Sequence, residues 1–335
     1  MNLAIIGTNF ISDWFMTAGK HCEKLKVRAV YSRTLEKGRS FADKYGIPDC
    51  YDSLEALAAA ENVEAVYVAS PNALHAGQSI QMLNAGKHVL CEKSIASNEK
   101  ELRAMLEAAE RNHVIVMEAM RSVLDPGFAA IQENLPKLGK IRRATIQYCQ
   151  YSSRYDKFKN GIIENAFKPE LSNGSLMDIG VYCVHPMVKL FGKPDEISAS
   201  GIKLLNGVDG MGTIVAKYEE QGILAELIYS KITDSILPTQ IQGEEGCMLI
   251  EEIYNTGKLT IRYRDKSQEE IQIEKIDPSN NMYYEIEEFI RAAESGEGAK
   301  EHNRYSLWEM QVMDEARRQM GIVFPADEKQ EAGQI

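Results

Sequence analysis

The sequence contains no long apolar run, no cluster of basic residues and no Cys-x-x-Cys pair. No apolar stretch approaches ~20 residues, the length of a membrane-spanning helix, so we expect no membrane span. The formal net charge is -11, whereas proteins that bind nucleic acid present clustered lysine and arginine, so nucleic acid is not an expected partner. Six unpaired cysteines in a chain of 335 residues favour reduced thiols in a cytoplasmic protein.

The chain also lacks a basic leader, an internal repeat and a low-complexity tract. An apolar strand begins at once over residues 3–6, so we expect no signal peptide. With 335 residues and 44% hydrophobic content, the chain is long enough for about two domains, each with its own core.

Short apolar runs alternate with helical patterns from the start of the chain to about Glu118. In one helical segment, over 98–112, Asn98 and Glu101 fit a helix-start capping pair. Strands joined by such helices form a parallel sheet that is covered on both faces. We therefore predict a doubly wound α/β domain over residues 1–120, with strands at 2–6, 26–31, 64–68, 87–91 and 114–117.

Beyond Pro126 the pattern changes to one helix, a polar stretch over 152–173, another helix and a long series of strands. Hairpin signals at 219–222 and 255–257, with period-two alternation between and beyond them, predict a mostly antiparallel sheet of six or more strands.

Two helices, over about 281–295 and 303–320, follow this sheet. The sequence thus predicts a second, α+β domain over 121–325 and a flexible polar tail over 326–335.

The turn after the first strand has only one of the three glycines of a dinucleotide-binding fingerprint. Gly7 stands at the first position, and Asn9 and Ser12 stand at the second and third. Asparagine tolerates positive φ and serine is small, so a pyrophosphate turn remains feasible, although an ordinary strand–helix turn is also compatible. The expected cofactor contacts here are Gly7, Thr8, Asn9, Phe10 and Ile11.

The second strand ends without the acid that usually binds the ribose 2'-hydroxyl of NAD. Ser32 and Arg33 stand there instead, and a hydroxyl and a guanidinium suit a 2'-phosphate. This predicts NADP(H) in preference to NAD(H). The alternative is that Arg33 is an ordinary surface residue.

The strand over 87–91 ends on Glu92 and Lys93. Ligands of open α/β sheets bind at the carboxyl ends of the strands, so Lys93 is our first candidate for chemistry, although most lysines are simply solvated.

Residues 69–75, Glu92-Lys93 and 174–182 together resemble the motifs of the glucose-fructose oxidoreductase and inositol dehydrogenase family, Gfo/Idh/MocA. The resemblance covers nearly the whole chain. It implies a Rossmann domain, a second domain with a large open sheet, and a homodimer or homotetramer built through that sheet. It also implies that the nicotinamide nucleotide is bound by Ala69, Ser70, Pro71, Asn72, His75, Glu92, Lys93, Met120 and Arg121. For His75 a role at the helix start is equally compatible.

Two positions depart from the family pattern. Ser94 replaces the proline that usually follows the lysine, and Tyr182 stands where many members have histidine. Tyrosine there is similar to the branch with dimeric dihydrodiol dehydrogenase and xylose dehydrogenase.

Asp178 and Tyr182 are four residues apart on a predicted helix and share a face, with His185 near the same side. Structural roles compete with catalysis, because Ser175 and Asp178 fit a capping box and buried tyrosines often only pack. Gly180 favours function, since a mid-helix glycine costs roughly 1 kcal/mol and is better explained by a close approach to the backbone.

Carbonyl reduction requires a proton donor, and the sequence has no cluster of metal ligands. The reference pKa of tyrosine, near 10, would have to fall by ~2 to 3, on the order of 3 to 4 kcal/mol, which a neighbouring ammonium can supply. We hypothesise that Tyr182 is the acid, that Lys93 lowers its pKa and binds the substrate oxygen, and that Asp178 orients Lys93 or a substrate hydroxyl. Substrate contacts are expected from Tyr155, Asn165, Phe167 and His185.

The sequence therefore predicts an NADP-dependent dehydrogenase or reductase that acts on a sugar, polyol, diol or related hydroxy-carbonyl compound. Two alternatives remain at this point, because fold alone does not fix function. One is a non-catalytic NADP-binding regulator, and the other is a redox-neutral enzyme that cleaves glycosides with a tightly held nicotinamide.

Overall fold

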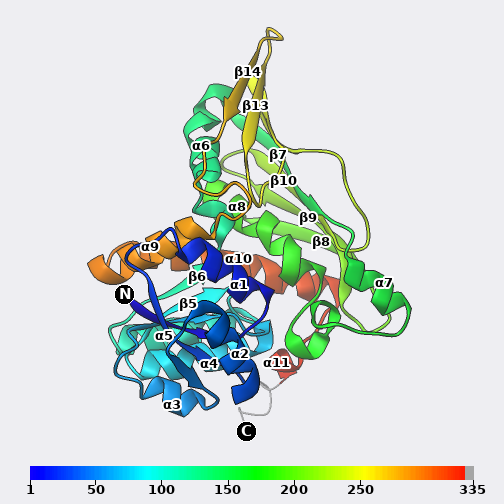
Figure 1. Cartoon of the computed structure of the whole chain (residues 1–335). Coiled ribbons are helices and arrows are strands. Elements are labelled where there is room, and N and C mark those ends of the chain that lie inside the picture. Colours follow the sequence, from blue (N-terminus) through cyan, green and yellow to red (C-terminus); the bar gives the residue numbers. More distant parts are fainter. Residues whose placement is uncertain (329–335) are drawn as a thin grey trace. The chain divides into compact units, whose positions relative to one another are not determined.

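The computed structural model describes residues 1–328, and it divides into two compact units, each with its own sheet (Figure 1). The first unit comprises Met1–Met120 and Ser279–Leu307. The second comprises Arg121–Pro278 and the chain from Trp308 onward. No helix within residues 1–328 is both long and apolar enough to cross a membrane.

The first unit contains a sheet of six parallel strands in the order β3-β2-β1-β4-β5-β6. All five predicted strands are present. The sixth, β3, was not predicted, because three residues are too few to show a period. The strands are β1 (Asn2–Ile6), β2 (Lys26–Tyr31), β3 (Asp49–Tyr51), β4 (Ala65–Val68), β5 (His88–Glu92) and β6 (Val116–Ala119).

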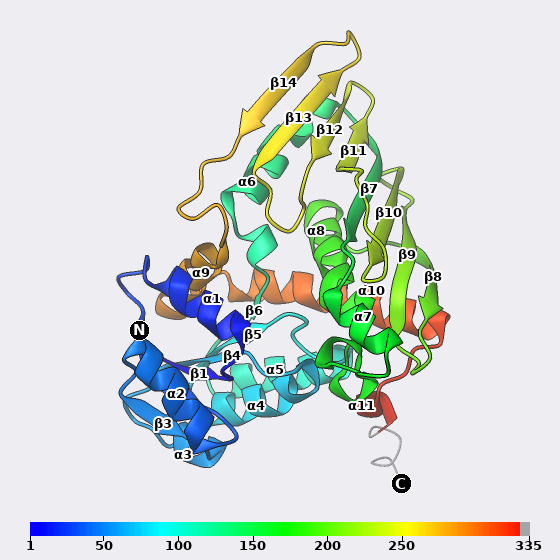
Figure 2. The same cartoon turned by 45° about the vertical axis from the view of Figure 1, so that its right-hand side comes forward.

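Helices cover both faces of this sheet, as the doubly wound pattern predicts. Helices α4 (Asn72–Asn84) and α5 (Glu99–Arg111) pack side by side on one face, and α1 (Phe10–Gly19) lies with α9 (Met282–Ser295) on the other (Figure 2). Helices α2 (Leu35–Tyr45) and α3 (Leu54–Ala58) flank β3.

The predicted cap of α5 is confirmed. The side chain of Asn98 accepts a hydrogen bond from the backbone N–H of Glu101 at 3.0 Å. The Glu101 carboxylate in turn accepts from the N–H of Ser97 at 2.9 Å.

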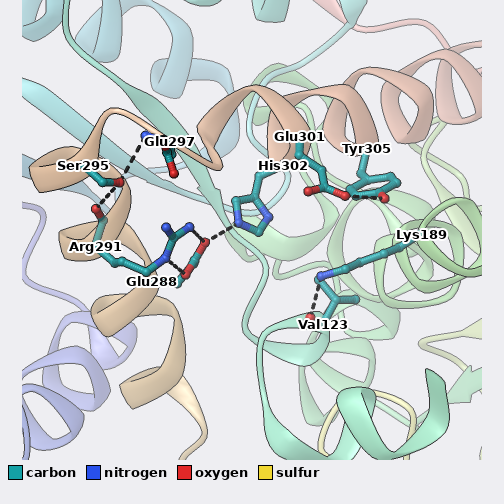
Figure 3. Close-up of polar contacts among 9 residues, drawn as sticks. All are labelled: Val123, Lys189, Glu288, Arg291, Ser295, Glu297, Glu301, His302 and Tyr305. Carbon is teal, nitrogen blue, oxygen red and sulfur yellow. Dashed lines mark hydrogen bonds and ion pairs between the residues drawn. The ribbon is translucent and has the colours of Figure 1, made fainter. Parts of the chain in front are cut away.

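Residues 279–307 belong to the first unit, whereas the sequence placed them with the rest of 121–325. Asn280 donates to the backbone oxygen of Trp14 at 2.9 Å, and Ser306 donates to Glu118 on β6 at 2.6 Å. Glu288 of α9 lies 2.7 Å from the His302 ring nitrogen. This contact ties α9 to the start of α10 (Ala299–Met320) (Figure 3). Sequence order alone does not reveal which sheet a late helix covers.

The second unit contains an eight-stranded sheet in the order β14-β13-β12-β11-β7-β10-β9-β8. The predicted, mostly antiparallel sheet is confirmed, and one pair, β7 with β10, is parallel. Strand β7 was not predicted, because adjacent arginines at 142 and 143 interrupt its alternation. The strands are β7 (Ile141–Cys149), β8 (Glu196–Lys203), β9 (Asp209–Tyr218), β10 (Ile223–Ser230), β11 (Thr239–Gly243), β12 (Gly246–Ile250), β13 (Lys258–Tyr263) and β14 (Gln268–Gln272).

One face of this sheet forms the core of the second unit. Along β10, residues Ala225, Leu227 and Tyr229 are buried, while the residues between them are more exposed. Helices α6 (Pro126–Asn134) and α8 (Val181–Phe191) lie on the buried face (Figure 2).

The polar stretch between β7 and α8 is built from short helical turns. It contains α7 (Ser153–Lys159), 3-10 turns at Asn165–Phe167 and Pro169–Leu171, and a π-helical segment at Leu176–Gly180 that leads directly into α8. Two further 3-10 turns, Arg121–Val123 and Leu135–Leu138, flank α6.

The first residues of the predicted flexible tail, 326–328, are part of a helix. Residues Pro325–Glu328 form the short helix α11, in which Asp327 accepts a hydrogen bond from the buried Arg317 at 2.7 Å. The rest of the predicted tail, 329–335, lies outside the described residues.

Candidate functional site

The turn after β1 brings two backbone segments together at the carboxyl ends of neighbouring strands. A Cβ atom at Gly7 would lie 2.7 Å from the carbonyl oxygen of Ala69, and Gly7 has a φ of +113°. Ser12 is fully buried, and its hydroxyl donates to the Gly7 carbonyl at 3.0 Å. A glycine and a small residue are therefore required here, as a dinucleotide-binding turn demands.

Asn9 holds this turn in a different way from the one that the sequence suggested. Its φ is -95°, so tolerance of positive φ is not what the position requires. Its side chain instead caps α1, accepting from the N–H of Ile11 at 2.9 Å, and donates to the Ala69 carbonyl at 2.8 Å. Thr8 is half-buried, and Phe10 is exposed beside the start of the helix.

Ser32 and Arg33 follow β2 with opposite exposure. Ser32 is buried, and its N–H donates to the Tyr51 carbonyl at 3.1 Å. Arg33 is exposed, and within residues 1–328 no hydrogen bond or ion pair holds its guanidinium. That group is therefore available to a ligand.

His75 connects the loops that follow β4 and β5. Its Nε2 lies 2.7 Å from the Ser70 carbonyl and its Nδ1 lies 2.9 Å from the Ser94 carbonyl. The ring is fully buried, and burial lowers its pKa. This geometry favours the structural alternative for His75, because both ring nitrogens already face backbone oxygens. Of the other residues in the first loop, Ala69 and Asn72 are buried, and Ser70 and Pro71 are half-buried.

Lys93 lies just beyond β5, in a loop anchored on both sides. Before it, the buried Glu92 accepts a hydrogen bond from the Tyr67 hydroxyl. After it, the peptide to Ser94 is cis, and the N–H of Ile95 donates to Glu118 at 3.0 Å. Lys93 itself is half-buried.

Glu118 was not among the residues predicted from the sequence. Glu118 is a buried acid within the four-residue strand β6. A buried acid needs hydrogen-bond or ionic partners, and this requirement could have indicated its role. Met120, which follows this strand, is buried.

In the second unit, Asp209 anchors the segment that carries Asp178 and Tyr182. Its carboxylate accepts from the N–H of Leu176 at 2.6 Å, and its Oδ1 lies 2.2 Å from where a Cβ of Gly174 would be. Asp209, and not the predicted capping box, therefore holds the start of this segment.

Gly180 is explained by packing. A Cβ there would lie 3.0 Å from the ring of Tyr229, so the close approach that the sequence suggested is made by a side chain of the protein.

Asp178 forms an ion pair with Lys231, a residue that the sequence analysis did not single out. The Lys231 side chain is 5% exposed and that of Asp178 is 26% exposed. The Lys231 ammonium also lies 5.3 Å from the centre of the Phe167 ring. A lysine one residue beyond a predicted strand gave only a weak signal, since most such lysines are solvated.

Tyr182 is buried in an aromatic group. Its ring centre lies 5.9 Å from that of Tyr148 and 6.5 Å from that of Tyr254, and the Arg121 guanidinium lies 5.4 Å above it. Burial raises the pKa of Tyr148 strongly and that of Tyr254 to about 12, so neither neighbour is suited to exchange protons near neutral pH.

The remaining residues that the sequence predicted to contact substrate lie in two different places in the second unit. Tyr155 and Phe167 pack in one cluster, with ring centres 6.2 Å apart, and Asn165 is exposed beside it. His185 is buried, and its Nδ1 lies 2.5 Å from Glu309 on α10. That contact gives His185 a structural role that the sequence did not predict.

The strand order of the first sheet, together with the glycine turn after β1, defines a dinucleotide-binding Rossmann domain. Residues 1–120 match the family described as an oxidoreductase family with an NAD-binding Rossmann fold, and residues 134–249 match the GFO/IDH/MocA C-terminal domain.

Two curated relatives match along their whole length. The scyllo-inositol 2-dehydrogenase (NADP(+)) IolU of Bacillus subtilis is 47% identical over 98% of this chain and 99% of its own. The uncharacterized oxidoreductase YgjR of Escherichia coli is 38% identical over 98% of both chains. The chain belongs to the Gfo/Idh/MocA family, and it is an NAD(P)-dependent oxidoreductase.

Solved structures show the same fold at lower identity. The 3-ketoreductase KijD10 from Actinomadura kijaniata, in complex with NADP and TDP-benzene, superimposes with a TM-score of 0.85 at 22% identity, covering 96% of this chain and 98% of that one. The aldose-aldose oxidoreductase of Caulobacter crescentus gives a TM-score of 0.83 at 20% identity, covering 95% and 97% of the two chains.

We predict that the stability contributed by Asp209 depends on pH. Burial raises its pKa from 3.8 to about 6, so its contribution is fully present below about pH 4 and is lost as the pH rises through about 6. The loss amounts to about 3 kcal/mol. Asp209→Asn should therefore become more stable relative to the wild type between pH 4 and pH 7 when urea unfolding of both is compared. A difference in unfolding free energy that stays constant over this range would contradict the assignment.

Proposed function

We propose that the protein is an NADP-dependent dehydrogenase or reductase that acts on a CH–OH group of a sugar, polyol or diol. The observation that carries this proposal is the anchored segment in which Asp178 and Tyr182 lie one helical turn apart. The names of the relatives support it, since IolU is a scyllo-inositol dehydrogenase and a zebrafish (Danio rerio) relative at 30% identity is a dihydrobenzenediol dehydrogenase.

In this proposal the nicotinamide, when bound, donates or accepts the hydride. Tyr182 gives a proton to the developing alkoxide in the reductive direction, as general acid catalysis requires. Lys93 binds the substrate oxygen. Asp178 binds a substrate hydroxyl, which suits a carboxylate that is one-quarter exposed.

The residues of the first unit fit a dinucleotide. Gly7 has a positive φ and packs against the Ala69 carbonyl, which gives the tight turn that the first glycine of a dinucleotide-binding fingerprint provides. The unpaired guanidinium of Arg33 suits the 2'-phosphate of NADP, which can accept two parallel hydrogen bonds from it.

Replacing the proposed acid should abolish most turnover. We expect Tyr182→Phe and Lys93→Met each to lower kcat by ~10²- to 10⁴-fold, the usual contribution of general acid catalysis. The measurement is NADPH oxidation with a panel of ketoses, inososes and α-dicarbonyl compounds. Tyr263→Phe, which alters a half-buried tyrosine on β13, is the matched control and should keep wild-type turnover. If Tyr182→Phe keeps near wild-type turnover, Tyr182 is not the proton donor and that role falls to Lys93.

Cofactor preference should depend on Arg33. We expect Arg33→Ala to weaken NADPH binding by ~10- to 100-fold, the value of hydrogen bonds to a charged group, and to leave NADH binding nearly unchanged. Dissociation constants from fluorescence titration test this. Arg103→Ala, which removes an exposed arginine on α5, is the control. Equal affinity of the wild type for NADPH and NADH would contradict the proposed preference for NADPH.

We also propose that the open face of the eight-stranded sheet joins two copies of this chain. Apolar side chains gather on neighbouring strands of that face, where the register pairs Ile228 with Thr213 and Leu224 with Lys217. On β9 and β10 they are Met211, Val215, Leu224 and Ile228, and Leu249 lies further along the sheet on β12; all five are half-buried or exposed. A mixed apolar and polar face of this kind suits a self-complementary interface.

A charge on this face should weaken the assembly. We expect Val215→Asp to shift the wild-type dimer or tetramer toward monomer in sedimentation velocity, because a carboxylate would be desolvated in the interface. Val323→Asp is the control, since that valine is 59% exposed and is not part of a sheet strand. A monomeric wild type would contradict the proposed interface.

A further inference from the structure

Lys231 is a buried lysine whose backbone is fixed on two sides. It follows the last residue of β10, its N–H donates to the Gly210 carbonyl, and its carbonyl accepts from the N–H of Ser152, both at 2.9 Å. These bonds place the start of its side chain between two neighbouring segments. Its ammonium therefore has a defined position within the second unit.

The ammonium contacts two residues of different kinds. It forms an ion pair with Asp178, and it lies 5.3 Å from the centre of the Phe167 ring. It also contributes favourably to the ionised form of the buried Asp209. A buried ammonium is stable only when it is paired, and Asp178 provides that pairing.

The two partners of the ion pair differ in exposure. Lys231 is 5% exposed and Asp178 is 26% exposed, so a ligand in solvent can reach the carboxylate more readily than the ammonium. An ionised carboxylate only accepts hydrogen bonds, and it has room for about four. A carboxylate that is paired with one ammonium can therefore still accept a hydrogen bond from a hydroxyl.

We propose that Lys231 is a positioning residue that fixes the ionised Asp178 carboxylate so that it accepts a hydrogen bond from a second hydroxyl of the substrate. The inference rests on the proposed function and deepens it. According to this inference, the preferred substrate has a hydroxyl on the carbon next to the reacting carbon. The Lys231–Asp178 pair recognises that hydroxyl.

A structural role alone would predict a different outcome. Removing one partner of a buried ion pair that serves only to hold the fold lowers stability and leaves substrate recognition unchanged, whereas replacing both partners by well-packed apolar residues is often neutral. Lys231→Met keeps most of the apolar stem against Phe167 and removes only the charge. If the charge positions Asp178, substrate recognition suffers even though the protein remains folded.

The test compares four variants of the full-length protein: Lys231→Met, Lys231→Arg, Asp178→Asn and the double variant Lys231→Met/Asp178→Asn. The substrates are a polyol that the wild type turns over and its analogue lacking the neighbouring hydroxyl. We expect Lys231→Met to raise KM for the polyol at least 10-fold with a smaller change in kcat. Lys231→Arg should restore most of the loss, because the positive charge is kept.

The double variant separates positioning from general damage. Because Lys231 acts through Asp178, adding Lys231→Met to Asp178→Asn should change KM less than twofold. The dissociation constant for NADPH should stay at the wild-type value in all variants. For the deoxy analogue, Lys231→Met and the wild type should have similar KM values.

Lys275 provides a matched control, since it is a second buried lysine of this unit, paired with Asp125 at 2.8 Å and 2% exposed. Lys275→Met should lower the thermal unfolding temperature and leave KM unchanged. Additive effects of Lys231→Met and Asp178→Asn, or an unchanged KM in an active Lys231→Met protein, would overturn this inference alone. A wild type without turnover on any polyol would overturn the proposed function as well.

Discussion

The segment that carries Asp178 and Tyr182 depends on a buried carboxylate. Asp209, on β9, accepts the N–H of Leu176 at the start of the π-helical segment and lies so close to Gly174 that no side chain fits there. This contact sets where the segment begins, and therefore where Asp178 and Tyr182 lie one turn later. The raised pKa of Asp209 shows that burial makes its ionised form costly, a cost that the hydrogen bonds to backbone N–H groups only partly offset.

The first unit uses the same kind of anchor. Gly7 meets the backbone of Ala69, Asn9 bonds both the start of α1 and Ala69, and His75 joins the loops after β4 and β5. These contacts bring the carboxyl ends of the strands together, where α/β sheets bind nucleotides. In both units, then, polar side chains fix short irregular segments of backbone, and the candidate catalytic residues project from those segments.

Much of this could be predicted from the sequence, and the misses have physical causes. The alternating strands of residues 1–120, the Asn98–Glu101 cap and the mostly antiparallel second sheet followed from periodicity and turn chemistry, which are local. Strand β7 was missed because its arginines interrupt the alternation. Glu118, Asp209 and Lys231 were missed because their roles come from partners at least 23 positions away in the sequence. The grouping of residues 279–307 with the first sheet is likewise a long-range property.

The central claim is that this protein transfers hydride directly between NADPH and a carbonyl carbon of a hydroxylated substrate. The most direct test is turnover with NADPH deuterated at C4 of the nicotinamide, on the transferred face, followed by mass spectrometry and NMR of the product. The account predicts one deuterium per product molecule, on the carbon that bears the new hydroxyl, with stoichiometric formation of NADP⁺. Substrate consumption without deuterium in the product and without net NADP⁺ would contradict it, as would tight NADPH binding with no turnover of any substrate in the panel.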